Sequence, residues 1–236
     1  MTFCLRVYKQ KTKKNMKKSL LILLFCAVAV GISAQDEKPS DKAFLMFLHG
    51  GYCFAPNLRG DGLTSPSADY AKKLSSGGSW NAQAYFRTKM FIVGLMYSGF
   101  TTSGSYVASL EESQNQLTSS DKLLTTYIAP QVGMNIPVKS FDIGWNLGLG
   151  GMWLKNNGTV FEKPRILKGS TIGANLNVRG VYNFTKNLGL SMEVMGVAAS
   201  IGAAHVNYHD QNLKVEYFPL MPLYQFSFSL GLKCSF

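Results

Sequence analysis

The chain has 236 residues, of which 16% are charged and 12% aromatic, and its formal net charge is +11. This length fits one domain or two small ones. Seven Lys and Arg residues lie before residue 35 without any acid, so the remaining 202 residues hold 17 basic and 13 acidic residues, a net charge of +4. This distribution argues against a nucleic-acid-binding surface and assigns most of the basicity to a leader.

The segment Met16–Gln35 is organised like a secretory signal peptide. Two Lys residues precede an apolar run from Leu20 to Ile32, and small residues lead to Ala34. Thirteen apolar residues are too few for a membrane-spanning helix, which needs about 20, but they fit the h-region of a signal peptide. We expect residues 1–34 to be an N-terminal extension and cleaved signal peptide with the true start at Met16, and residues 35–42 to be a short periplasmic lead-in.

Eight stretches of the mature chain alternate between apolar and small or polar residues, and this period of two predicts strands. Most are longer than the ~5–6 residues of a typical globular strand, and they match the ~9–11 residues with which a tilted strand crosses a bilayer. The expected strands are Ala43–Phe54, Ser79–Arg87, Met90–Thr101, Lys122–Ile136, Phe141–Leu154, Thr171–Phe184, Leu188–Ala199 and Leu220–Phe236.

The connections between these stretches alternate in length. Three are tight turns and four are long and rich in Ser, Gly and Asn: the turns at 87–89, 137–140 and 185–187, and the loops at 57–78, 102–121, 155–170 and 200–219. This rhythm is typical of a barrel with short periplasmic turns and long outer loops. The sequence therefore predicts an all-β fold, an eight-stranded antiparallel up-and-down transmembrane β-barrel over residues 43–236, in which the last strand closes against the first.

A soluble barrel of the lipocalin type, whose apolar face points inward, is the alternative. The faces opposite the apolar rows of the fifth, sixth and eighth stretches decide against it. They carry Gly and Asn together with Asp142, Arg179 and Lys233, which is typical of a packed polar interior and not of an exterior rich in Lys and Glu.

Aromatic residues fall at both ends of the expected strands, as in the two interfacial girdles of transmembrane barrels. The expected girdle at the short-turn end contains Phe86, Phe91, Phe141, Phe184 and Phe236, and the one at the long-loop end contains Phe54, Trp80, Phe100 and Trp153.

With its signal peptide, eight alternating strands, loop rhythm and terminal Phe, the chain resembles small outer-membrane β-barrel proteins of Gram-negative bacteria. The OmpA/OmpX-like barrel domain and the PorT-like family are the nearest, and the resemblance covers essentially the whole mature chain. It implies a location in the outer membrane, contact with its lipid and lipopolysaccharide, and recognition of C-terminal aromatic residues by the barrel-assembly machinery. Phe228 and Phe236 would then belong to the insertion signal.

Eight strands enclose an interior that side chains just fill, so the sequence predicts a polar plug and not a wide pore. The turn centred on Lys186 sets Arg179 opposite Glu193, and pairing them avoids an unpaired charge that would cost several kcal/mol. His49, beside two glycines, is expected to be a core histidine of the lumen. The expected polar network of the lumen contains Arg87, Asp142, Asn175, Asn177, Arg179, Glu193 and Lys233.

We expect no catalytic residue, no metal centre and no cofactor. The candidate metal ligands are His205 and His209 in "HVNYHD", but nothing predicts the helix that their spacing would need. A lipid A-modifying hydrolase would require a Ser–His pair with an acid, and although Ser200 lies near these histidines, the strand pattern aligns no triad. Cys53 and Cys234 should lie near opposite ends of adjacent strands, too far apart for a disulfide.

The sequence thus favours a structural, adhesion or surface-interaction role, with an extracellular ligand held by the long loops and no nucleic acid. Narrow porin-like passage of small solutes and a barrel component of a secretion system stay open as alternatives, and a lipid A-modifying enzyme is less favoured. The loops carry four tyrosines suited to a recognition surface: Tyr70, Tyr106, Tyr208 and Tyr217.

Overall fold

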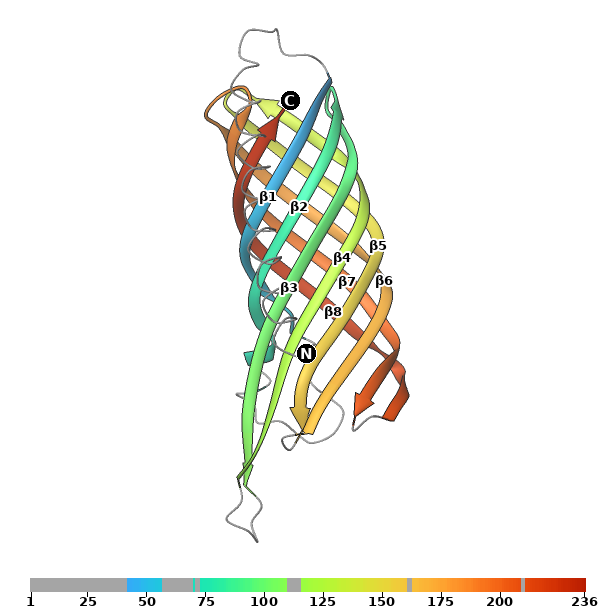
Figure 1. Cartoon of the computed structure of the whole chain (residues 1–236). Coiled ribbons are helices and arrows are strands. Elements are labelled where there is room, and N and C mark those ends of the chain that lie inside the picture. The colour runs from blue at the N-terminus through green and yellow to red at the C-terminus, as the bar shows by residue number, and fades with distance from the viewer. Residues whose placement is uncertain (1–41, 57–69, 71–72, 110–115, 161–162, 209–210) are drawn as a thin grey trace, which may run out of the picture.

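The computed structural model describes residues 42–56, 70, 73–109, 116–160, 163–208 and 211–236. Eight antiparallel strands within these residues follow one another around a closed barrel (Figure 1). They are β1 (Lys42–Phe54), β2 (Ser76–Thr88), β3 (Phe91–Ser109), β4 (Gln116–Val138), β5 (Phe141–Val160), β6 (Lys163–Asn183), β7 (Leu188–Tyr208) and β8 (Gln211–Ser235). Among the described residues, no helix has the length and apolar character needed to cross a membrane. The predicted fold class is confirmed, and the expected signal peptide lies outside the described residues.

The last strand closes the barrel against the first. The register of β8 and β1 runs from Leu45 opposite Ser235 to Phe54 opposite Phe226. The terminal Phe236 extends it, because its backbone exchanges hydrogen bonds of 2.9 and 3.1 Å with that of Phe44. The ladder therefore pairs β1 on both sides and pairs β8 on both sides from Phe226 to Ser235.

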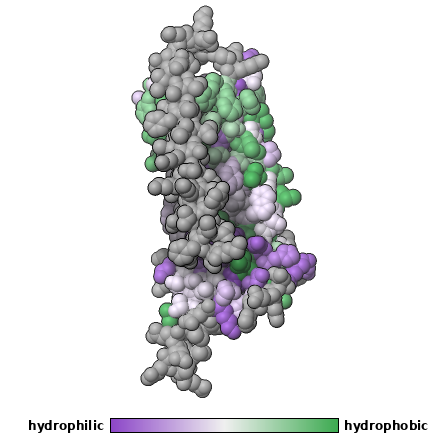
Figure 2. Space-filling view, viewed as in Figure 1, coloured by the Kyte–Doolittle hydropathy of each residue, from purple (hydrophilic) through white to green (hydrophobic). Residues whose placement is uncertain are grey.

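The outer face of the barrel is an apolar belt. Along β5, Phe141, Ile143, Trp145 and Leu147 are exposed, whereas Asp142 and Asn146 between them are buried inside. The same alternation repeats on β6 and β7, and Figure 2 shows apolar residues gathered on the part of the surface nearer the short turns. These side chains are exposed among the described residues, and so large an apolar surface suits contact with lipid.

Aromatic side chains mark both borders of the belt. At the short-turn end, Phe86, Phe91, Phe141, Phe184 and Phe236 are all exposed. At the other end Phe54, Trp80 and Trp153 are exposed, and the Trp80 ring lies 4.8 Å from that of Tyr97. These placements correspond to the two interfacial girdles of a transmembrane barrel.

Phe100 is not part of the girdle, and this prediction is wrong. Its side chain is 1% exposed and packs inside the barrel. The expected third strand is apolar on both faces, so the sequence did not reveal which parity faces lipid. The outward positions are those of Tyr97 and Gly99, and the indole of Trp80 lies so close that a Cβ on Gly99 would meet it at 2.5 Å.

Three of the four expected long loops are wrong, because the strands continue through them. The ladder of β3 and β4 extends to Ser109 opposite Gln116, that of β5 and β6 to Val160 opposite Lys163, and that of β7 and β8 to Tyr208 opposite Gln211. The Ser, Gly and Asn content of these segments reflects exposure to water, and it does not prevent backbone pairing. The barrel therefore projects paired hairpins beyond its apolar belt.

Two further features follow the expectations. Cys53 and Cys234 are free cysteines, and their opposite partners on the β1–β8 ladder, Ser227 and Met46, lie near opposite ends of it. The short turns after β2 and β4 are tight enough to place Lys89 and Lys139 at φ values of 56° and 55°.

The closed ladder predicts heat-modifiable migration on gels. Unboiled protein in dodecyl sulfate should stay folded and migrate differently from the boiled, unfolded chain, because all eight strands must separate together before the barrel opens. A chain denatured in urea before loading serves as the unfolded control. Identical migration of all three samples would contradict the closed barrel.

Candidate functional site: the closed interior

The interior at the short-turn end is held by an ion pair between β5 and β8. Lys233 Nζ lies 2.5 Å from Asp142 Oδ2 and donates a second hydrogen bond, of 2.9 Å, to Asn183 Oδ1. Both charged side chains are almost fully buried. Their pairing neutralises these two buried charges.

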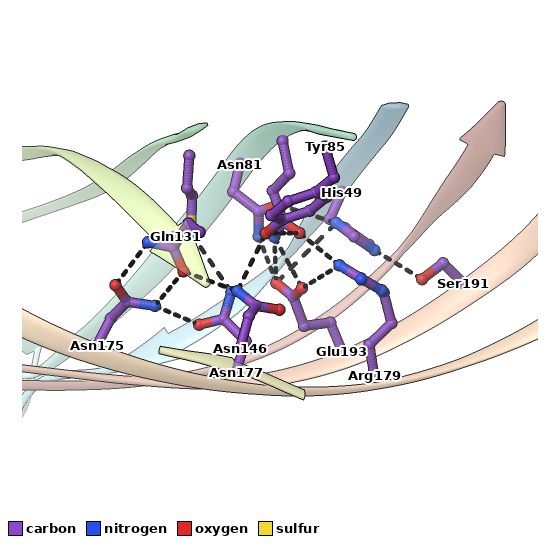
Figure 3. A network of polar contacts seen from close by, with 12 residues as sticks. His49, Asn81, Tyr85, Gln131, Asn146, Asn175, Asn177, Arg179, Ser191 and Glu193 are labelled. Carbon is purple, nitrogen blue, oxygen red and sulfur yellow. Dashed lines mark hydrogen bonds and ion pairs between the residues drawn. The ribbon is translucent and has the colours of Figure 1, made fainter. Parts of the chain in front are cut away.

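At mid-barrel the carboxylate of Glu193 is the centre of a polar network (Figure 3). Asn81 Nδ2 donates to Oε1 at 2.9 Å, and Gln83 Nε2 donates to both oxygens at 3.0 and 2.7 Å. Arg179, directly opposite Glu193 in the register of β6 and β7, places Nη1 3.7 Å from Oε2. A buried carboxylate needs several donors, and this one has them from strands on opposite sides of the barrel.

The Arg179 guanidinium is held on its other side by aromatic rings. Its Cζ lies 3.7 Å above the centroid of Phe47 and 5.3 Å from that of Tyr85, and Nη1 donates to Gln83 Oε1 at 2.6 Å. Ring stacking suits the weakly hydrated face of guanidinium. Arg179 therefore combines charge pairing with the packing of a large side chain.

His49 belongs to the same network and forms a pair with a serine that the sequence did not reveal. Ser191 Oγ lies 2.9 Å from His49 Nε2, and Nδ1 lies 2.8 Å from Asn81 Oδ1 and 4.0 Å from Glu193 Oε1. The carbonyl oxygen of Asn81 assigns the proton to Nδ1, so that Ser191 donates to Nε2. The arrangement resembles a nucleophile, a base and an orienting group, but Ser191 is 0% exposed.

Next to this centre, four amide side chains cross-link β4, β5 and β6. Gln131 and Asn175 exchange hydrogen bonds of 2.8 and 3.1 Å. Asn146 donates to Gln131 at 2.7 Å, and Asn175 donates to Asn177 at 2.8 Å. They pack against Gly148, where a Cβ would meet Gln131 Nε2 at 2.0 Å, so this amide cluster depends on a glycine.

The half of the interior nearer the long hairpins is mainly apolar, with a buried hydrogen bond of 2.8 Å from Gln225 to Thr125 at the same level. The residues of this apolar layer include Met96, Phe100, Leu123, Tyr127, Met152, Leu154, Met195, Val197, Ile201 and Leu223. The expected polar plug therefore fills only the other half of the barrel. On β7, the inward row of Ser191 and Glu193 continues with Met195 and Val197. The two-residue period shows which residues point inward, but it does not show that the interior changes from polar to apolar along the strand.

Above the apolar layer, residues of the β1–β2 connection fold into the mouth of the barrel. Tyr70 and Leu74 are buried and pack against Gly104, where a Cβ would meet their side chains at 3.2 and 3.4 Å. Tyr70 donates a hydrogen bond to Asp121. The expectation of an exposed recognition residue is therefore wrong for Tyr70.

We call Tyr70 and Leu74 of this connection the covering segment. Asp121 anchors it by accepting the hydrogen bond of Tyr70. Arg165 Nη2 lies 2.5 Å from Asp121 Oδ1, and Asn156 donates to the same oxygen at 2.8 Å. Burial raises the pKa of the Tyr70 phenol, and the hydrogen bond to Asp121 acts in the same direction. Tyr70 therefore stays protonated as a donor at neutral pH.

No protein-family model matches the sequence, and no curated protein matches it. Among solved structures it is similar to a major outer membrane protein from Thermus thermophilus, with 11% identity, coverage of 83% of this chain and 99% of that chain, and a TM-score of 0.53. The shared fold and the lipid-facing belt together decide the class. The chain has the fold of an outer-membrane β-barrel protein.

The barrel is also similar to two structures with lower TM-scores. Neisserial surface protein A has 15% identity, with coverage of 82% of this chain and 99% of that chain and a TM-score of 0.45. OprG from Pseudomonas aeruginosa has 13% identity, with coverage of 83% and 97% and a TM-score of 0.46.

The remaining candidate residues lie apart from the network. Arg87 occupies an inward position on β2 but is half-buried at the short-turn border. His205 is exposed on the outer face of β7, opposite Lys168 and Lys214, and His209 lies outside the described residues. No group of three His, Cys, Asp or Glu side chains among the described residues could hold a metal ion.

The Arg179–Glu193 pair predicts strongly non-additive stability effects. Arg179→Met and Glu193→Gln should each lower the free energy of unfolding by about 3–5 kcal/mol, because each leaves a buried charge without its partner. The double variant should lose about 1–3 kcal/mol less than the sum of the two. Denaturant unfolding in detergent micelles, followed by tryptophan fluorescence, measures all four chains.

The exposed pair Lys214 and Glu216, 2.7 Å apart on β8, offers a matched control for this cycle. Lys214→Met with Glu216→Gln should show a smaller coupling than the interior pair, because water screens exposed charges. Additive losses at Arg179 and Glu193 would show that the two side chains do not act as a pair.

The burial of the Ser191–His49 pair predicts that it is chemically silent. A fluorophosphonate probe should leave the folded barrel unlabelled, because the probe has to reach Ser191 Oγ inside the packed interior. An active serine hydrolase added to the same detergent solution controls for the probe. Labelling of the barrel that disappears in Ser191→Ala would contradict this interpretation and indicate an accessible nucleophile.

Proposed function

We propose that this outer-membrane barrel is a non-enzymatic anchor whose paired hairpins act outside the membrane in adhesion or another surface interaction. The observation that carries the proposal is the contrast between its two ends. The interior is filled by the network around Glu193, the apolar layer and the covering segment of Tyr70, whereas β3 to β8 continue beyond the belt as hairpins. A filled lumen favours anchoring over passage.

The partners we propose follow from this placement. The belt and its girdles contact outer-membrane lipid, and the outer-leaflet lipopolysaccharide surrounds the bases of the hairpins. The exposed Phe228 and the terminal Phe236 on the closing strand would form the insertion signal that the barrel-assembly machinery reads. An extracellular ligand would meet the hairpin ends, of which that of β3 and β4 reaches farthest in Figure 1.

The lack of an enzymatic role is part of the proposal. Ser191 and His49 are both buried inside the barrel, and the orienting group of the pair is the amide of Asn81. Ser200 and His205 lie on β7, where the strand partners of His205 are lysines and not an acid. These observations favour binding over hydrolysis.

Shortening the β3–β4 hairpin tests the proposal. Val107 and Thr118 are opposite each other, so residues 108–117 can be replaced by Asn-Gly, which favours a two-residue hairpin turn. In a deletion strain, the wild-type chain should restore attachment of cells to surfaces, and the shortened chain should insert normally but not restore it. Attachment assays and heat-modifiable migration measure the two properties separately.

A matched control changes the opposite end. Asn-Gly in place of Lys139 and Ser140 suits the positive φ of Lys139 and should leave attachment unchanged. Full attachment with the shortened hairpin would contradict a role for that hairpin. Stable single-channel steps from the wild-type chain in planar bilayers would favour solute passage instead.

A further inference from the structure

Three lysines gather on the outer face of the barrel just beyond the apolar belt. Lys122, Lys155 and Lys168 come from the neighbouring strands β4, β5 and β6, and all three are exposed. Lys155 lies directly opposite Lys168. Lys122 lies opposite Asn157 and therefore diagonally to Lys155.

This lysine patch places like charges at close range. Side chains directly opposite on antiparallel strands have Cβ atoms about 4.5–5.5 Å apart, and diagonal neighbours about 7–8 Å apart. Like charges in these positions destabilise a sheet. An anion held between the three ammonium groups would remove this repulsion.

No described acid neutralises the lysine patch. Asp121, next to Lys122 in the chain, faces the interior and is bound by Arg165 at 2.5 Å. Glu216 pairs with Lys214 at 2.7 Å, and this hydrogen bond lowers the pKa of Glu216. His205 lies between Lys168 and Lys214 across the strands, so one strand, β7, separates the Lys214–Glu216 pair from the patch. The positive charge of the three lysines is therefore available to a ligand.

Neutral hydrogen-bonding groups surround the lysine patch. Ser103 lies opposite Lys122 and Ser170 opposite Trp153, while Asn157 lies beside Lys155 on the outer face. A hollow of about 390 Å³ adjoins Lys122 and is lined by three serines, Ser103, Ser105 and Ser120, together with Lys73 and the Asp121 carboxylate that Arg165 neutralises. Ammonium groups beside hydroxyl and amide groups suit a phosphorylated sugar.

The position of the lysine patch along the barrel axis favours a lipid headgroup over a free phosphate as the ligand. Trp153, exposed at the outer border of the belt, precedes Lys155 by two residues on the same face. Because a strand rises about 3.3 Å per residue, the Lys155 backbone lies roughly 7 Å along the strand from an interfacial anchor. Figure 2 shows polar residues gathering at this end of the barrel. This is the level of lipid headgroups.

We propose that Lys122, Lys155 and Lys168 form a binding site for the phosphate groups of the outer-leaflet glycolipid. The site deepens the lipid contact of the proposed function and rests on the outer-membrane placement. It needs no extracellular ligand at the hairpin ends and no open lumen.

Binding of bisphosphorylated lipid A tests the site. The full mature chain, folded in detergent micelles, is titrated with this lipid and with the same lipid after removal of both phosphates, and native mass spectrometry counts the complexes. Lys122→Gln, Lys155→Gln and Lys168→Gln combined should weaken binding of the phosphorylated lipid about 100-fold, since each lysine near a charged membrane surface contributes roughly fivefold.

The control variant combines Lys89→Gln, Lys139→Gln and Lys186→Gln at the short-turn end. It loses the same net charge and should bind like the wild type, while heat-modifiable migration verifies that every chain is folded. Equal affinity of the patch variant and the wild type, or equal affinity for the two lipids, would overturn the site. Displacement of the lipid by inorganic phosphate at equal concentration would assign the site to a free anion. The attachment of cells to surfaces is measured for the patch variant as well. If attachment persists while lipid binding is lost, the lipid site and the proposed surface interaction are separate properties.

Discussion

The hydrogen bonding of the backbone inside the apolar belt is the constraint on which the rest of the molecule depends. Lipid offers no partner to an exposed N–H or C=O group, so every strand needs a paired neighbour on both sides. The pairing of β8 with β1, extended to Phe236 by its bonds with Phe44, meets this requirement. Once the ladder is closed, alternate side chains must point inward. These inward side chains then have to pack together and satisfy their charges and hydrogen bonds inside the barrel.

The interior meets that demand in two ways along the barrel axis. Near the short turns, charges are neutralised in pairs, Lys233 with Asp142 and Arg179 with Glu193, and the amides of Gln131, Asn175 and Asn177 hydrogen-bond to one another. Nearer the hairpins, methionine, leucine and aromatic side chains exclude water in the apolar layer. Buried charge pairs contribute less to stability than apolar packing but penalise wrong partners strongly. The polar half therefore favours one strand register, because each charge needs its own partner. The apolar half fills the interior without requiring specific partners.

The sequence predicted the architecture well because lipid exposure imposes a strict period. Strands such as Phe141–Val160 show one apolar and one polar face, and counting from the turn at Lys186 sets Arg179 opposite Glu193, as the register has them. Prediction failed where that contrast disappears. Phe100 lies on a strand that is apolar on both faces, and the hairpin extensions carry the composition of loops although they pair as strands. The His49–Ser191 contact joins residues 142 positions apart, which no local pattern reveals.

The paired hairpins beyond the belt have a consequence for how the protein can change over time. Their backbone bonds are formed within each hairpin and its neighbours, so their outward side chains contribute little to holding the barrel in the membrane. Substitutions there are expected to be tolerated while the belt and the interior stay fixed. The outer end is therefore a surface on which new binding specificities can arise without endangering insertion, and the barrel acts as a constant support for a variable tip.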